Sequence, residues 1–222
     1  MANYCVLDLE FCTIPKKKRL QKKYSLEIIQ IGCVFLNEEL EVTNTFKSYI
    51  KPSYGGELDQ HVMDLTGIKN HHLKSAPSAK EIIEKLGAMV DDDTFFVTWG
   101  DSDTKMIERQ LDLEHLATGN DIKVPEYFDE LLYDYIDCQQ LFSEVLDAPL
   151  DKLYRLSDAV MISNIKSDDH FHDALSDAKN TASLFKKIYE EGENFTVSPY
   201  YIRECDAATM WSDPFAQRYY TV

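Results

Sequence analysis

Two acidic residues at the end of an apolar stretch are the first candidates for chemistry. Asp8 and Glu10 follow Val6 and Leu7, with one residue between them. Side chains alternate along a strand, so both carboxylates are expected on one face. At about 5 Å and an effective dielectric constant of about 20, their repulsion is on the order of 3 kcal/mol. A divalent cation that prefers oxygen ligands, Mg²⁺ or Mn²⁺, would offset it. The alternative is a solvated strand end, which is the more common setting for such a pair.

A second acidic pair, Asp101 and Asp103, follows the apolar residues 94–99 and Gly100. This pattern predicts a buried strand that ends where a helix begins, a place where α/β proteins often carry functional groups. Asp101 or Ser102 can cap the helix. Capping accounts for only one of the two acids and leaves one further carboxylate for chemistry.

A histidine and an aspartate mark the start of the last predicted helix. Asp177 lies on its first turns beside Ala174 and Ala178, so we expect it to point at the sheet edge. Asp173 is predicted to be the N-cap. His172 has a side chain whose ordinary pKa, near 6.5, suits a base around neutral pH. The alternative for a histidine just outside a helix, an ordinary surface residue, is the more common case.

Apolar, β-prone runs predict five strands, at residues 4–9, 27–36, 42–50, 94–99 and 133–138. The second run is apolar on both faces, as in a central strand, and the third is mixed, as in an outer strand. Helical periodicity predicts helices from the capping box of Ser78 and Glu81 to Val90, after Gly100, and near residues 139–147, 151–162 and 173–191. Strands first and alternation afterwards indicate an α/β fold with helices on the faces of a mixed sheet.

Length and composition exclude several classes of protein. The chain has 222 residues, 44% of them hydrophobic, and five cysteines. This is enough for one domain with a real core, which excludes a disordered chain and a disulfide-stapled mini-protein. The odd cysteine count, without a C-x-x-C pair, indicates free thiols rather than disulfides or a zinc ribbon. Since neither a basic leader nor a long apolar run is present, we expect a cytoplasmic protein without signal peptide or membrane span.

The charge of the chain is strongly uneven. The formal net charge of −16 argues against a nucleic-acid coat or a binder of anionic membranes. However, residues 16–23 (KKKRLQKK) carry six basic residues and no acid, just after the first strand. This stretch is a candidate for contacts with phosphates. The alternative is a mobile, solvated loop.

Taken together, the motifs resemble those of one family. D-x-E on the first strand, G-x-x-D after a later strand and H-x4-D at a late helix follow the order of the DEDDh 3′–5′ exonucleases, the superfamily of RNase T and the proofreading subunit of bacterial DNA polymerase III. The chain is most similar to the branch of the histone-mRNA/siRNA 3′ exonuclease and the sporulation-kinase-inhibitor-like exonucleases. The resemblance covers residues 3–189 and includes residues 27–32 (EIIQIG), 49–52 (YIKP) and 65–68 (LTGI).

The resemblance implies a ribonuclease H-like fold with a five-stranded mixed sheet flanked by helices. It assigns four metal-binding carboxylates and a general base, namely Asp8, Glu10, Asp103, Asp177 and His172. It also implies two divalent metal ions, Mg²⁺ or Mn²⁺, that clamp a scissile phosphate, and release of nucleoside 5′-monophosphates. Ser176 stands where many relatives carry a further aspartate, which is not a ligand.

Substrate contacts are predicted less directly. The expected partner is the 3′ end of single-stranded or short nucleic acid, with RNA favoured over DNA by the branch resemblance alone. Phe11 and Leu65 are candidates for the shelf under the terminal base, although a core role for Phe11 is equally consistent. The candidates for phosphate contacts are Lys16, Lys17, Lys18 and Arg19.

The last thirty residues are rich in aromatic side chains. They include Phe195, Tyr200, Tyr201, Trp211, Phe215, Tyr219 and Tyr220. We therefore expect an exonuclease domain at residues 1–192 and an extension at 193–222 that packs on the domain or on a protein partner. Two other functions stay open: a non-catalytic regulatory protein on the same fold, and a proofreading exonuclease bound to a polymerase.

Overall fold

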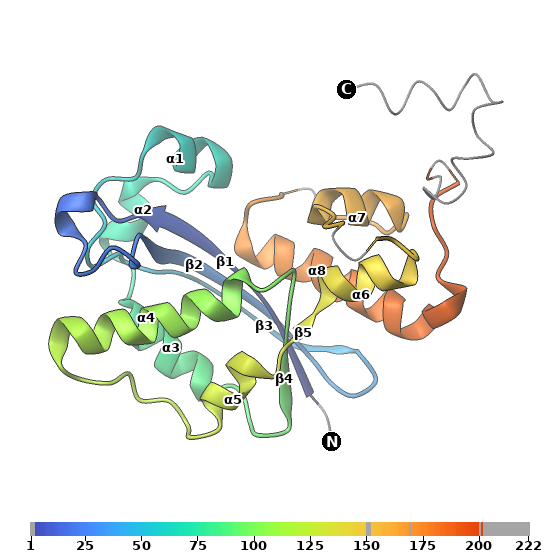
Figure 1. Cartoon of the computed structure of the whole chain (residues 1–222), viewed down its shortest axis with the longest axis horizontal. Coiled ribbons are helices and arrows are strands. Elements are labelled where there is room, and N and C mark those ends of the chain that lie inside the picture. Colours follow the sequence, from blue (N-terminus) through green and yellow to red (C-terminus); the bar gives the residue numbers. More distant parts are fainter. Residues whose placement is uncertain (1–2, 150–151, 169, 200, 202–222) are drawn as a thin grey trace.

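The computed structural model describes residues 3–149, 152–168, 170–199 and 201. A five-stranded sheet runs through it in the order β3-β2-β1-β4-β5 (Figure 1). The strands are β1 (Asn3–Thr13), β2 (Leu26–Leu36), β3 (Val42–Tyr49), β4 (Thr94–Thr98) and β5 (Ile136–Asp137). β2 runs antiparallel to β1 and β3, whereas β4 is parallel to β1 and β5 is parallel to β4. The predicted α/β class with a mixed sheet is confirmed.

Two strands differ in length from the prediction. β1 continues four residues past the predicted end at residue 9, because its antiparallel pairing with β2 resumes after a β-bulge between Glu10 and Phe11. β5 has only two residues, Ile136 and Asp137, instead of residues 133–138, and it lies between the end of α5 at Tyr133 and the start of α6 at Cys138. β3 lies at the edge of the sheet and β2 inside it, as their polarity patterns predict.

Within the described residues, eight α-helices connect and cover the strands. They are α1 (Gln60–Thr66), α2 (Asn70–Lys74), α3 (Ala79–Gly87), α4 (Ser102–Thr118), α5 (Phe128–Tyr133), α6 (Cys138–Val145), α7 (Leu156–Ile162) and α8 (Ala174–Glu191), with short 3₁₀ turns at Lys16–Lys18 and Gly192–Asn194. The helices α3, α4, α6, α7 and α8 confirm predicted ones, although α3 ends before Val90 and α7 begins later than residue 151. The others were not predicted, since five to seven residues are too few to show helical periodicity.

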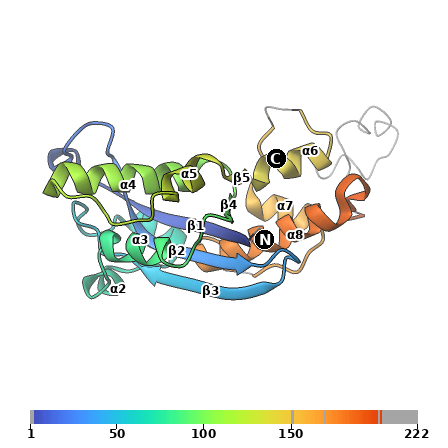
Figure 2. The same cartoon turned by 90° about the horizontal axis from the view of Figure 1, so that it is seen from below.

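Each face of the sheet carries its own core. The side chains of Cys5, Leu7 and Leu9 pack with α3, α4 and α5. The alternate residue Val6 packs instead with Val97 and with the helices α6, α7 and α8. Figure 2 shows these last three helices grouped together, apart from α3, α4 and α5. Because Asp8 and Glu10 share the phase of Val6, they belong to the face that α8 covers.

The chain continues past α8 along this second core. Phe195 is buried, with its ring edge-on to Phe142, and the Tyr201 hydroxyl lies 3.1 Å from that of Tyr154. The remaining aromatic residues of the expected extension, Tyr200 and those beyond Tyr201, lie outside the described residues.

Two expectations about the cellular setting have structural counterparts. Cys5, Cys12, Cys33 and Cys138 are buried free thiols, whereas Cys205 lies outside the described residues. In the part of the chain that the structure describes, every helix is too short or too polar to cross a membrane.

Candidate active site

Asp8 and Glu10 lie on the half of β1 that has a neighbouring strand on one side only. Their register partners on β2 are Gly32 and Gln30. On the other side, β4 pairs only with residues 3–6 of β1. Glu10 is buried and Asp8 is half-buried. The unpaired side of β1 therefore leaves room for polar groups from other elements to approach both carboxylates.

α4 brings Asp103 to this place. Asp103 lies in the first turn of α4, is buried, and accepts a hydrogen bond from the backbone N–H of Leu9 on the unpaired side of β1. Asp101 occupies the N-cap position without a capping side-chain hydrogen bond, and forms an ion pair with Lys105 instead. Of the two acids, Asp103 is thus the one close enough to Asp8 to repel it.

The position of α8 is set by two residues of β2. At Gly32 a Cβ atom would lie 2.2 Å from the carbonyl carbon of Ala174, so only glycine allows α8 to begin this close to the sheet. Two residues earlier, the buried Oε1 of Gln30 accepts a hydrogen bond from the Ala174 N–H at 2.8 Å. These contacts place Asp177, in the first turn of α8, beside Asp8 and Glu10.

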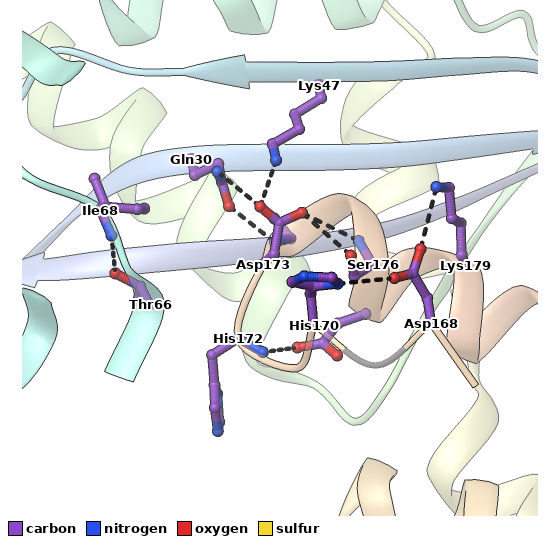
Figure 3. A network of polar contacts seen from close by, with 12 residues as sticks. Gln30, Lys47, Thr66, Ile68, Asp168, His170, His172, Asp173, Ser176 and Lys179 are labelled. Atoms are coloured by element: carbon purple, nitrogen blue, oxygen red, sulfur yellow. Dashed lines mark hydrogen bonds and ion pairs between the residues drawn. The ribbon is translucent and has the colours of Figure 1, made fainter. Parts of the chain in front are cut away.

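Asp173, the residue before α8, is bound from two strands (Figure 3). Its Oδ2 accepts hydrogen bonds from Lys47 on β3 and, at 3.4 Å, from Gln30 Nε2 on β2. Its Oδ1 accepts from the Ser176 N–H at 3.3 Å, as an N-cap does. Burial alone would raise the pKa of Asp173, but the ion pair with Lys47 brings that pKa below its ordinary value.

His172 has a left-handed backbone, with φ 65°. Such a conformation is strained for a residue with a side chain, and the His172 N–H is bound by Asp177 Oδ2 at 2.8 Å. Figure 3 shows the side chains of His172 and Asp173 leaving the loop in opposite directions. The exposed imidazole offers a ring nitrogen that lies with carboxylate oxygens of Glu10 and Asp177 in a group no wider than 4.8 Å.

The four carboxyl groups strongly perturb one another. Burial, together with the charges of Asp177 and Asp103, raises the pKa of Glu10 to about 8. Burial and the charge of Asp177 raise the pKa of Asp103 to about 7. The pKa of Asp8 lies well above its ordinary value, first through burial and then through the other three acids. Burial also raises the pKa of Asp177. All four can be ionised near neutral pH only if positive charge compensates them.

The residues present fit a divalent metal ion. Asp177 Oδ1 is buried but has no hydrogen-bond partner among the described residues. An orphaned carboxylate oxygen beside Glu10 and His172 is unusual for a folded protein and ordinary for a metal ligand. Carboxylate oxygens are the ligands that suit Mg²⁺ or Mn²⁺. Asp8 and Asp103 offer further oxygen donors next to this group.

The structure separates the two residues predicted to lie under a terminal base. Phe11 is partly buried against the core on the α3 side of the sheet. Leu65 lies on α1 with 43% of its surface exposed. Leu65 is therefore the more accessible of the two for contact with a substrate.

The predicted basic stretch is only partly available for binding. Lys18 Nζ donates to the Gly55 carbonyl at 2.7 Å, and Arg19 Nε donates to the Ile14 carbonyl at 2.9 Å. These two side chains hold the loop in place. Lys16 and Lys17 are exposed at the 3₁₀ turn that follows β1.

Three residues that position the site were not predicted from the sequence. They are Gln30, Gly32 and Lys47. Both Gln30 and Gly32 interrupt an otherwise apolar central strand, and this interruption was visible in the sequence. A buried polar residue such as Gln30 needs a hydrogen-bond partner. No such signal exists for Lys47, because lysine is common on an exposed edge strand.

Comparison with known proteins gives a consistent result. A family model described as Exonuclease (RNase_T) matches residues 5–185. The probable 3′–5′ exonuclease KapD of Bacillus subtilis is 24% identical over 188 residues, which cover 84% of each chain. Human ERI1 exoribonuclease 3 is 25% identical over 201 residues, 85% of this chain but only 54% of that protein. This chain therefore spans about half the length of ERI1 exoribonuclease 3.

Solved structures show the same fold. The nuclease domain of 3′hExo, described as a DEDDh family member bound to rAMP, superimposes with a TM-score of 0.68 at 19% identity. The alignment covers 88% of this chain and 96% of that one. The mixed sheet with flanking helices is thus of the ribonuclease H-like exonuclease type.

Proposed function

The chain belongs to the Exonuclease family, whose model spans residues 5–185, and from this premise we propose that it hydrolyses the terminal phosphodiester at the 3′ end of single-stranded or short nucleic acid. The products are nucleoside 5′-monophosphates, and RNA is preferred over DNA. The observation that supports the proposal is the convergence of Asp8, Glu10, Asp103 and Asp177 with His172 at one end of β1.

Divalent metal ions, Mg²⁺ or Mn²⁺, are part of the proposal. Glu10, Asp177 and Asp8 are the proposed ligands at the attacking side, and Asp8 and Asp103 at the leaving side. When bound, the ions supply positive charge that lowers the pKa of the attacking water and offsets the charge of the phosphate. The orphaned Oδ1 of Asp177 supports this assignment.

His172 is the proposed general base. Its ring is exposed beside Glu10 and Asp177, so it can reach a water molecule held at these carboxylates. It accepts the proton of that water as the oxygen attacks phosphorus. The bound N–H of His172 and the clamped Asp173 keep the ring at this position.

Contacts with the substrate are also part of the proposal. Leu65 on α1 and, next to Glu10, Phe11 are the proposed contacts of the terminal nucleotide. Lys16 and Lys17 are the proposed phosphate contacts, with Lys18 and Arg19 as supports of their loop. Residues 1–192 form the proposed catalytic domain, and residues 193–222 an extension that packs on it or on a protein partner.

The preference for RNA is inferred from relatives. ERI1 exoribonuclease 3 is named for action on RNA, and the 3′hExo nuclease domain was solved with rAMP. Both are similar to this chain over most of its length.

A direct assay tests the proposal. The full chain is incubated with 5′-labelled single-stranded RNA and DNA of one sequence, with Mg²⁺, Mn²⁺ or EDTA. We expect shortening from the 3′ end with release of 5′-mononucleotides, faster on RNA, and none in EDTA or with Asp8→Asn. A wild-type chain that binds RNA but releases no mononucleotide would favour the regulatory alternative and overturn the proposal.

A further inference from the structure

The loop at residues 152–155, just before α7, is firmly bound although it has no regular secondary structure. The backbone carbonyl of Tyr154 accepts hydrogen bonds from Trp99 Nε1 at 3.0 Å and Gln139 Nε2 at 2.7 Å. The carbonyl of Lys152 accepts one from Ser143 Oγ at 3.1 Å. The Tyr154 ring itself is buried in the core on the α8 side. These contacts fix the loop and explain why α7 does not begin before it.

The bound loop presents two residues outward. Leu153 has 71% of its surface exposed, and Arg155, two residues on, is also exposed. Within the described part of the chain, the Arg155 guanidinium makes no hydrogen bond or ion pair, whereas Arg19 binds a backbone carbonyl. The Arg155 guanidinium is therefore available to bind an anion, in a chain whose net charge is −16.

A cavity connects this loop with the candidate active site. It has a volume of about 570 Å³, and its lining includes Leu153 and Arg155 of the loop, Trp99 and Phe171, and His172 and Asp177 of the candidate active site. This volume lies within the range of small-molecule and cofactor sites. Its lining combines apolar surface with one free guanidinium, which are the groups that bind a base and a phosphate.

The cavity shares His172 and Asp177 with the candidate active site, so it adjoins the proposed position of the scissile phosphate. Figure 1 shows the start of α8 between α1, which carries Leu65, and α7, which follows the loop. If the last nucleotide of a strand lies on the α1 side of His172, the cavity that His172 shares with Leu153 and Arg155 is open to the nucleotide before it.

We propose that Leu153 and Arg155 form a subsite for the nucleotide that precedes the terminal one. Arg155 binds the phosphate on the 5′ side of that nucleotide, one linkage before the scissile bond, and Leu153 packs on its base. The inference rests on the proposed function and adds a length requirement, because a dinucleoside monophosphate contains only the scissile phosphate.

Substrates of two lengths test this subsite. Initial rates are measured for the full chain on an RNA dinucleoside monophosphate and on the trinucleoside diphosphate. We expect Arg155→Ala to raise KM for the longer substrate about tenfold, as for the removal of one charge-assisted hydrogen bond, and to leave KM for the shorter one unchanged. Arg155→Lys should restore part of the affinity. Leu153→Ala should weaken both substrates, since both contain the preceding base. The matched controls are Arg109→Ala and Met161→Ala, also exposed but outside the cavity lining.

Binding is measured separately from catalysis, so that the proposed subsite and the proposed activity can each be refuted without the other. The probe is a 5′-fluorescein trinucleotide RNA with a phosphorothioate at its 3′-terminal linkage, followed by fluorescence anisotropy. We expect the same tenfold weakening for Arg155→Ala, with a salt slope smaller by about 0.7. Unchanged affinity of Arg155→Ala for the probe, or an equal effect of Arg155→Ala on KM for both substrate lengths, overturns the subsite. A wild type that binds the probe but never releases mononucleotides overturns only the proposed function.

Discussion

Gly32 on β2 and Ala174 at the start of α8 touch backbone to backbone. A Cβ atom at residue 32 would lie 2.2 Å from the Ala174 carbonyl carbon. Because Gly32 is also the register partner of Asp8, this contact determines how closely Asp177 approaches the carboxylates of β1. The absence of a Cβ atom at Gly32 thus sets the distance between Asp177 on α8 and the carboxylates of β1.

Gly32→Ala should therefore reduce both stability and activity. The obstacle is backbone rather than a flexible side chain, so α8 must shift, and overpacking of this kind costs about 1–3 kcal/mol. Urea unfolding measures the change in stability, and mononucleotide release measures the change at the site. Gly56→Ala is the matched control, because its nearest neighbour is Lys18 Nζ at 3.9 Å. Equal urea midpoints for the two variants would contradict the packing argument.

His172→Ala should lose activity without losing its fold. Removal of a general base lowers kcat by about 100- to 10,000-fold, while the exposed ring contributes little to the core. His170→Ala is the matched control, because His170 is exposed and pairs with Asp168 outside the carboxylate cluster. We expect His170→Ala to keep nearly full kcat, and both variants to keep the wild-type melting temperature. Full activity of His172→Ala would refute the assignment of the base.

The metal-free protein should become less stable as pH rises from about 4.5 to about 8. Glu10 has a folded pKa of about 8 and Asp103 of about 7, both above their unfolded values. The folded state therefore binds more protons than the unfolded state in this interval, and stability falls with pH. Each unit of pKa difference corresponds to about 1.4 kcal/mol.

Thermal unfolding in EDTA at pH 5 and pH 8 measures this effect. We expect a lower melting temperature at pH 8, and a recovery when Mn²⁺ is added. Asp8→Asn removes one of the repelling charges and should flatten the pH dependence in EDTA. A metal-free protein that is more stable at pH 8 than at pH 5 is incompatible with the charge cluster as described.

Lys16→Glu combined with Lys17→Glu should weaken substrate binding. Both lysines are exposed, and the removal of each lysine–phosphate interaction should reduce the salt slope by about 0.7. Lys18 is left unchanged because it holds Gly55. The control with the same charge change is Lys85→Glu with Lys123→Glu, two exposed lysines outside this loop. If both double variants raise KM equally, the effect is one of net charge and the loop does not bind the substrate.

The strands and the candidate carboxylates were accessible from the sequence because their signals are local. Alternation along β1 predicts that Asp8 and Glu10 share a face, and the capping pattern of Asp173 predicts the start of α8. Sequence order alone also places Asp103 after a buried strand. In each case the physical cause acts within a few residues, so a single sequence can show it.

The parts that escaped prediction depend on contacts between distant segments. The ion pair of Lys47 and Asp173 joins β3 to the loop before α8, and nothing local distinguishes Lys47 from any surface lysine. The proposed role of Arg155 depends on the hydrogen bonds from Trp99 and Gln139 that hold the neighbouring Tyr154 carbonyl. Helices as short as α1 and α2 are stabilised by tertiary packing rather than by intrinsic periodicity.

The residues of the candidate active site lie far apart in the sequence, which has a consequence for protein synthesis. β1 precedes α8 in the chain and lies in the middle of the sheet, and α8 with the loop before it brings Asp177 and His172 to β1. A chain still emerging from the ribosome therefore holds Asp8, Glu10 and Asp103 without the residues that complete the set. On the proposed function, a growing or prematurely terminated chain is inert toward the RNA around it, and nuclease activity begins only when nearly the whole domain has been translated and folded.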